Sequence, residues 1–215
     1  MANAQVLRNA VVQIQNQLGV AKTITAITKA AEAQITCTHD FAVGDLIVLS
    51  AIQGMTELND RVVRVKSVST TVSFVAEELD STNFTTYVSG GTAQKVTGML
   101  SFDNITQLSI PEQQPNEIDV TTIHDNEKQT IFGQREAPKA TFTLIADPLA
   151  VTSKEMAKAD ATATRRVIKI KLISGYTGIF NAFVSGGAGF DGSAGAVPSA
   201  SASFTLRGVT QWFAS

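Results

Sequence analysis

The sequence predicts a mainly β protein of the α+β class: a β-sandwich or barrel with one flanking helix, into which a small β-barrel module is inserted. Most apolar segments are short and rich in Val, Ile and Thr, a composition typical of strands. Several alternate apolar and polar residues, as antiparallel strands with one solvated face do. Only one segment, after Asp147-Pro148, has the start signal of a helix.

The composition argues against several function classes. The 215 residues suffice for one large domain or two small ones, and 44% hydrophobic residues can fill a core. A net charge of −2 argues against a basic nucleic-acid-binding domain. The single cysteine, Cys37, excludes an intrachain disulfide. No segment approaches the ~20 apolar residues of a membrane span, and polar residues interrupt any signal peptide near the N-terminus.

The first elements are predicted from short apolar runs. Residues 5–18 alternate imperfectly, which predicts a strand, although the same pattern fits an amphipathic helix. Residues 61–68 are expected to form a half-solvated strand, with Val63 and Val65 on one face and Val62 on the other, beside the charged residues. The strongest strand runs of the predicted module are 46–49, 61–68 and 71–75.

The middle of the chain is predicted as two strands and a long loop. Residues 99–110 read as one long strand, and residues 117–123 alternate cleanly as a second. Residues 124–139 are polar and contain Gly133 and Pro138, so they predict a loop. Loops of more than ~12–15 residues in compact domains are usually functional or disordered.

A strand and the single helix are predicted next. Residues 139–146 form a strand pattern with Phe142 and Leu144 on one face. Asp147 is predicted as the N-cap and Pro148 as the first helical residue. The expected apolar positions of the helix are Leu149, Met156 and Ala157.

The C-terminal part is predicted to hold three strands and a loop. Residues 165–173 alternate strongly, and residues 178–184 form another apolar run. Residues 184–203 are mostly Gly, Ala and Ser, which predicts a mobile loop. Residues 202–212 are expected to close the sheet. The side chains expected to pack inward from this last strand are Phe204, Leu206 and Val209.

The order of features from Thr23 to Thr92 resembles a known small module. A turn carries His39 and Asp40, Val43-Gly44-Asp45 follows, and the stretch FTTYVSGG closes the run. This order resembles the FCCH-like β-barrel modules, named after a half-domain of ubiquitin-activating enzymes, that recur in tail proteins of tailed phages. The resemblance implies an inserted module over residues 22–96.

The flanking segments, 1–21 and 97–215, resemble the tail-tube (major tail) proteins of long-tailed phages. The features that carry the resemblance are FDNITQLSI, the block beginning EIDVTTIHDNEKQ, the Asp147-Pro148 helix, IKIKLISGYTGIFNAFV and SASFTLRGVTQW. The resemblance implies a tail-tube-type fold and a structural virion protein without enzymatic activity. Its subunits would form stacked hexameric rings around a lumen through which phage DNA passes without specific binding.

The same resemblance implies partners and an assembly site. The partners are further copies of the chain and other tail proteins (tape measure, tail terminator and tail tip), in a tail assembled in the host cytoplasm without a membrane. The polar loop is expected to reach an adjacent ring and to fold on contact. The candidate assembly residues are His124, Asp125, Glu127, Lys128, Phe132, Arg135 and Glu136.

No catalytic, cofactor or metal site is predicted. The GAGFDG run at 187–192 matches G-x-G-x-x-G, but no helix pattern follows it and Pro198 interrupts the segment, so a flexible loop is expected. Neither His39 nor His124 has metal-ligand spacing, and turn or surface hydrogen bonds are expected for both. The alternative function is a tail-associated adhesin whose β-module binds carbohydrate or a host receptor.

Two charged clusters are predicted as solvated strand surfaces, and each has an alternative functional interpretation. Glu77-Glu78 with Asp80 is expected to be a solvated strand end, with a weak cation site as the alternative. The basic run at 165–171 alternates with apolar residues, which predicts one exposed strand face, with an inter-subunit salt-bridge stripe as the alternative.

Overall fold

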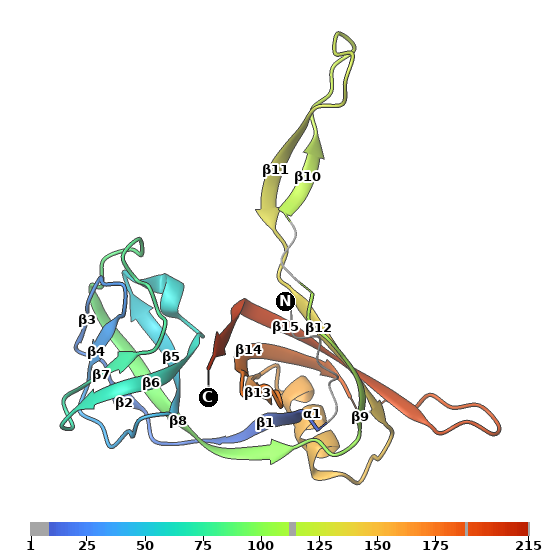
Figure 1. Cartoon of the computed structure of the whole chain (residues 1–215), viewed down its shortest axis with the longest axis horizontal. Coiled ribbons are helices and arrows are strands. Elements are labelled where there is room, and N and C mark those ends of the chain that lie inside the picture. Colours follow the sequence, from blue (N-terminus) through green and yellow to red (C-terminus); the bar gives the residue numbers. More distant parts are fainter. Residues whose placement is uncertain (1–8, 112–114, 188, 215) are drawn as a thin grey trace.

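The computed structural model describes residues 9–111, 115–187 and 189–214, without the side chain of Val209. The predicted fold class is confirmed: the chain is mainly β with one α-helix (Figure 1). The first elements are β1 (Val11–Leu18), β2 (Lys22–Thr23), β3 (Ala26–Ile27), β4 (Gln34–Thr36), β5 (Leu46–Gln53), η1 (Thr56–Leu58), β6 (Val62–Ser69), β7 (Ser73–Ala76) and β8 (Ser89–Ser101). The remaining elements are β9 (Ile105–Ser109), β10 (Pro115–Asp119), β11 (Thr130–Arg135), β12 (Lys139–Ile145), α1 (Val151–Ala161), β13 (Arg165–Lys171), β14 (Thr177–Gly186) and β15 (Ser199–Phe213).

One long strand, β8, links two units of the fold. Its first half pairs with β5, with Ile47 opposite Lys95, and its second half pairs with β1, with Ile14 opposite Leu100. The main sheet runs in the order β3-β4-β7-β6-β5-β8-β1-β13-β14-β15-β12-β9. We call the unit of β2–β7 and the start of β8 the module, and the rest of this sheet with α1 the body (Figure 1).

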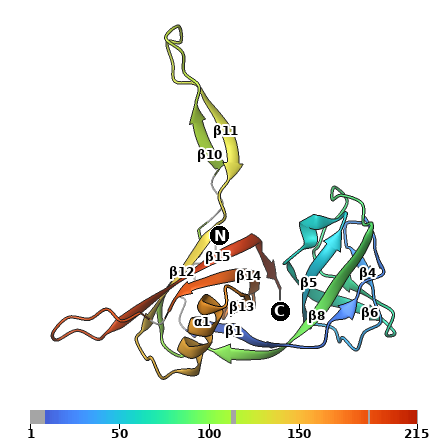
Figure 2. The same cartoon turned by 180° about the vertical axis from the view of Figure 1, so that it is seen from behind.

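Each unit has its own hydrophobic core. Phe74 lies at the centre of the module, where it meets the rings of His39 and Phe41 edge to face. In the body, Phe142 lies 4.3 Å from Phe204, measured between ring centroids, and both rings are fully buried. Helix α1 covers one face of the body sheet (Figure 2) and contributes Met156 to that core.

A third apolar cluster joins the module to the body. Leu46 and Val62 of the module pack with buried side chains of β13, β14 and β15. Polar contacts at Asp60 also join the module to the body. The Asp60 carboxylate forms an ion pair with Arg165, and the backbone carbonyl of Asp60 accepts a 2.8 Å hydrogen bond from Asn181 Nδ2. The predicted half-solvated strand is confirmed, since Val63 and Val65 are buried while Lys66 and Val68 are exposed, but its Val62 end is buried against the body.

The strand prediction for 5–18 is confirmed over Val11–Leu18, where β1 forms rather than a helix; its residues 5–8 lie outside the described ranges. The single strand predicted over 99–110 is wrong. The chain turns after Ser101, and Phe102 points into the core, where its ring meets Phe142 edge to face. Asn104 Nδ2 donates to the carbonyl of Ile145 at 2.7 Å. Asp103-Asn104 is therefore a turn signal inside an apolar run.

The predicted helix exists but begins later than expected. Its N-cap is Ala150, not Asp147. The Asp147 carboxylate instead accepts a 3.0 Å hydrogen bond from the amide of Leu149, a local turn that competes with helix capping. Leu149 therefore lies before the helix and is 77% exposed, whereas Met156 is buried as predicted and Ala157 is partly exposed. The buried helical residues are Thr152, Ser153, Met156 and Ala159.

The loop predicted over 184–203 is shorter in the structure. Strands β14 and β15 continue into it, with Ser185 opposite Ser203 and Gly186 opposite Ala202. The small residues of this segment are strand residues because alternate ones pack into the body core. The inward packing predicted for Val209 falls on a side chain outside the described set. None of the described helices is long and apolar enough to cross a membrane.

Candidate assembly surface

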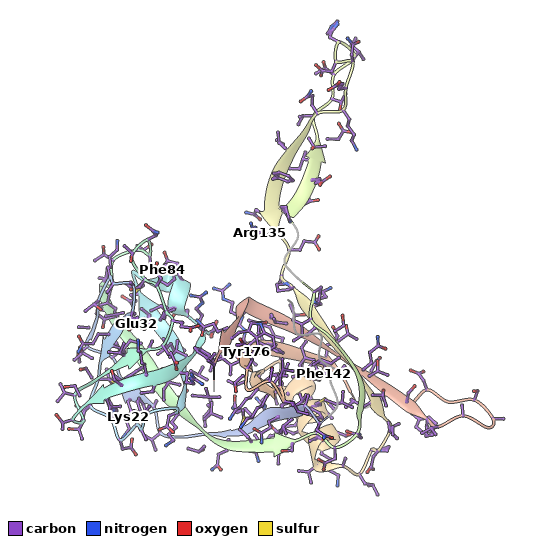
Figure 3. All side chains as sticks on the ribbon, viewed as in Figure 1. Lys22, Glu32, Phe84, Arg135, Phe142 and Tyr176 are labelled. Atoms are coloured by element: carbon purple, nitrogen blue, oxygen red, sulfur yellow. The ribbon has the colours of Figure 1, made fainter. Side chains whose placement is uncertain are left out.

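A two-stranded arm projects from the body, away from both cores (Figure 1). Among the described residues, its strands β10 and β11 pair with each other alone and form a separate sheet. Figure 3 labels Arg135, where the arm returns toward the body. An isolated hairpin is marginally stable in water because it has no second layer on which to bury a face. We call residues 115–136 the arm.

One face of the arm is apolar. Ile118 lies directly opposite Ile131, and the amide of Val120 donates a 3.0 Å hydrogen bond to the carbonyl of Gln129, so the ribbon continues beyond the assigned strands. Residues two apart on a strand share a face. Ile118, Val120 and Ile131 therefore form one apolar stripe, and their exposed fractions are 45%, 41% and 53%. Such an exposed stripe is typical of an interaction surface.

The rest of the arm adds exposed apolar groups to a polar ribbon. Phe132 lies opposite Glu117 on the second face and is 71% exposed. Ile123, in the turn at the tip, is 97% exposed. A Cβ atom at Gly133 would lie 3.0 Å from the Ile118 side chain, so the glycine leaves room for Ile118 to pack against the backbone of β11.

The tip of the arm is held by carboxylate–backbone hydrogen bonds. The Asp119 carboxylate accepts from the hydroxyl and the amide of Thr121, and these bonds, with a smaller effect of Lys128, hold its pKa below the ordinary value. The Asp125 carboxylate accepts from the amide and the hydroxyl of Thr122, both at 2.8 Å, and these bonds lower its pKa likewise. The tip is thus a defined turn despite its exposure.

The predicted assembly residues all lie on this arm, and all are exposed. His124, Asp125, Glu127 and Lys128 gather at the tip, whereas the other predicted residues lie on β11 and at its base. The prediction of one long loop over 124–139 is wrong, since residues 130–135 are a strand and Lys139 already begins β12. The structure thus brings the tip residues together and separates them from Phe132, Arg135 and Glu136.

The apolar stripe is not among the predicted assembly residues. Alternation around Ile118 and Val120 fits an ordinary strand face, and Ile131 lies in the segment predicted as a polar loop. The available signal was the apolar pair Ile131-Phe132 inside that otherwise polar segment. A pair of apolar residues opposite an alternating strand predicts a hairpin rather than a loop.

A second hairpin projects from the body on the side away from the module (Figure 2). Its loop, residues 187–198, holds the G-x-G-x-x-G match and two exposed apolar residues, Phe190 and Val197. No helix follows the glycines, so the loop lacks the amide cluster that binds a dinucleotide pyrophosphate.

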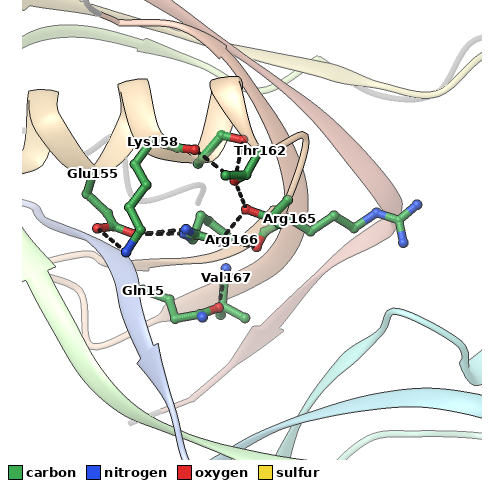
Figure 4. Close-up of polar contacts among 9 residues, drawn as sticks. Gln15, Glu155, Lys158, Thr162, Arg165, Arg166 and Val167 are labelled. Atoms are coloured by element: carbon green, nitrogen blue, oxygen red, sulfur yellow. Dashed lines mark hydrogen bonds and ion pairs between the residues drawn. The ribbon is translucent and has the colours of Figure 1, made fainter.

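The basic run does not form one exposed face. Arg166 bonds the Glu155 carboxylate of α1, with Nε at 3.0 Å and Nη2 at 2.9 Å, whereas Arg165 points to the other side of β13 (Figure 4). There it pairs with Asp60 of the module. Both arginines therefore serve contacts inside the chain. Their alternation places them on opposite faces, which the one-face interpretation overlooked.

The remaining candidate groups have structural roles. His39 is buried, stacks on Phe41 and accepts a 3.1 Å hydrogen bond from the Phe41 amide through Nδ1, which confirms a turn role but not a surface one. The Glu77 carboxylate accepts a hydrogen bond from Arg64. Burial raises the pKa of the Cys37 thiol to about 11, so Cys37 is a poor nucleophile. Within the described ranges, no cluster of three potential metal ligands occurs.

An extended β-sheet body with a projecting, apolar-faced arm defines a subunit built to join other subunits. The chain belongs to the phage tail tube protein family, TTP, whose sequence profile matches residues 53–213. It is therefore a structural tail tube subunit, placed in the tail of the virion. The matched range begins inside the module and includes the arm and the second hairpin.

A second similarity covers a smaller part of the chain. Over 77 residues the chain is 42% identical to ubiquitin-activating enzyme E1 1 of Arabidopsis thaliana. The similar stretch is 34% of this chain but 7% of the plant enzyme. The chain therefore spans a small fraction of that enzyme's length, and the enzyme's activity does not transfer to it.

Proposed function

We propose that this tail tube subunit forms hexameric rings that stack into the hollow tube through which phage DNA is delivered. The observation that carries the proposal is the arm, which exposes an apolar stripe at a distance from the body core. In the tube, the stripe packs against a subunit of the adjacent ring. The low net charge of −2 fits a lumen that DNA crosses without being held, since each neutralised phosphate adds affinity.

Burial of the apolar stripe of the arm would contribute free energy to ring stacking. Full burial of an Ile or Val side chain is worth roughly 1.5–3 kcal/mol, and about half of each stripe residue is already covered. Covering the stripe would therefore contribute about 1 kcal/mol for each of Ile118, Val120 and Ile131. Such a contact is weak alone and becomes strong when every subunit of a ring engages at once. Assembly in the host cytoplasm and contacts with tape measure, terminator and tail-tip proteins belong to this proposal.

We further propose that residues 22–96 are an inserted FCCH-like module displayed outside the tube. Its core is separate from that of the body, and the amide of Gly19 donates a 2.7 Å hydrogen bond to the carbonyl of Lys95, which closes the neck of the unit. The 77-residue similarity to a ubiquitin-activating enzyme is close to the module in length.

Negative-stain electron microscopy with size-exclusion chromatography, over a range of concentrations, tests the main proposal. The intact chain is expected to give rings or hollow tubes. A variant that joins Val120 to Gln129 through Asn-Gly, a favoured two-residue hairpin turn, removes the tip while keeping both strands. It is expected to stay folded and to stack poorly, because it lacks the exposed Ile123 and the charged tip residues, whereas normal stacking would assign the contact to the stripe alone. A chain that remains monomeric at every concentration, even with tail-tip initiator proteins added, contradicts the proposal.

A further inference from the structure

A small pocket lies where the module meets the body. Its volume is about 270 Å³, and it is lined by Glu57, Arg61, Phe84 and Arg207. Glu57 comes from η1, Arg61 precedes β6, and Phe84, labelled in Figure 3, lies in the connection from β7 to β8. Arg207 comes from β15 of the body, so the pocket is complete only when module and body are docked.

The two arginines of the pocket have no carboxylate partner within 4.0 Å among the described residues, unlike Arg64, Arg165 and Arg166. Glu57 lines the same pocket, but one of its oxygens is engaged by the amide and the hydroxyl of Thr85, each at 2.8 Å. The lining therefore carries two positive charges against one negative charge.

Arg61 is held in an environment that disfavours its charge. Its side chain is half-buried, and its guanidinium carbon lies 5.6 Å from the centre of the Phe84 ring. Burial lowers the pKa of Arg61, and the nearby charge of Arg207 lowers it further. Two like charges brought together beside an apolar wall are unfavourable unless an anion balances them.

We propose that this pocket binds an oxyanion, gripped between Arg61 of the module and Arg207 of the body. Guanidinium groups present paired N–H donors that match the oxygens of phosphate and carboxylate groups. A bound oxyanion removes the unbalanced charge and adds a bridge to the Asp60–Arg165 contact between the two units. The oxyanion is either free phosphate or the carboxylate of a second copy of this chain, which share this chemistry.

Thermal unfolding at low protein concentration, with increasing sodium phosphate against sodium chloride of equal ionic strength, tests the site. Binding to the folded state raises the midpoint as phosphate increases. Arg207 is exposed, so Arg207→Gln leaves the fold intact, and it is expected to weaken phosphate binding about tenfold by removing charge-assisted hydrogen bonds. Lys154→Gln removes the same charge from an exposed helix position and is expected to respond as the native chain does.

Sedimentation velocity distinguishes the two sources of the oxyanion. If phosphate opposes self-association of the native chain but not of Arg207→Gln, the occupant is a carboxylate of a second copy. If phosphate binds without changing self-association, the occupant is the free anion. A native chain whose midpoint does not respond to phosphate beyond the chloride control overturns the proposal. So does an equal phosphate response in the native chain and Arg207→Gln.

Discussion

Phe142 shows how single side chains hold the body together. It is fully buried on β12, and its ring contacts Phe102, in the turn between β8 and β9, and Phe204 of β15. Its burial could be predicted, because the alternation of 139–146 places Phe142 and Leu144 on one face. The ring of Phe102 could not be placed in the same way, since its position depends on a chain reversal that periodicity does not reveal.

Phe142→Ala is expected to destabilise the chain by about 3–5 kcal/mol, the range for deleting a fully buried aromatic ring. The matched control is Phe132→Ala on the arm, where the ring is exposed and the expected change is within about 0.5 kcal/mol. Denaturant unfolding followed by circular dichroism measures both. Equal losses for the two variants would show that the arm is part of the folded core.

The tip carboxylates give the arm a pH dependence. Asp119 and Asp125 have pKa values lowered by hydrogen bonds from Thr121 and Thr122. A depressed carboxyl pKa means that the turn is stabilised above the ordinary value of about 3.9 and loses this stabilisation as pH falls through the lower, folded value. The amide signals of Thr121 and Thr122 in an NMR titration are expected to shift below about pH 4. Asp125→Asn should remove the Thr122 response and leave that of Thr121; an unchanged Thr122 response would mean that Asp125 does not hold the turn.

At the scale of elements, the arm shows that sequence periodicity predicts a strand and its apolar face but not the surface that covers this face. Strands such as 139–145 and 165–171 could be predicted because their apolar faces are buried in the same chain. The pattern around Ile118 is the same kind of signal, but no described part of the chain covers this face. Alternation indicates that a face needs covering and does not indicate what covers it. The polar tip residues could be predicted as exposed, whereas the apolar stripe could not.

The stripe itself can be tested by paired substitution. Ile118→Thr with Ile131→Thr keeps the strong strand preference of β-branched residues and removes most of the apolar surface. The subunit is expected to unfold at nearly the native temperature, because neither residue belongs to a buried core cluster, and to lose ring stacking in electron microscopy. Val68→Thr, exposed on the module, is the control and should assemble normally. If the double variant forms tubes as long as those of the native chain, the stripe is not the stacking contact.

At the scale of the whole molecule, module and body are joined by a neck and a docked face. The neck is short, since Gly19 and Lys95 are hydrogen-bonded neighbours. The docked face buries Val167, Ile179 and Phe213 against the module. The inserted unit stays a prediction that rests on the resemblance of its sequence to FCCH-like modules. The docking could not be predicted from the sequence, because Val62 lies on a charged strand and its partners are distant along the chain.

Excising residues 20–94 and joining Gly19 to Lys95 through a short glycine-rich linker tests whether the module is an insertion. The body core contains no module residue, so the body is expected to fold. Excision also exposes the docked face and leaves Arg165 without Asp60, so reduced solubility is expected. Val167→Thr and Ile179→Thr in the excised chain should restore solubility, and cooperative thermal unfolding with ring or tube formation would then show that assembly belongs to the body. An excised chain that stays unfolded even with these polar substitutions would make the module part of the folding unit, and β8, which pairs with β5 and β1 along its length, would be the element that couples them.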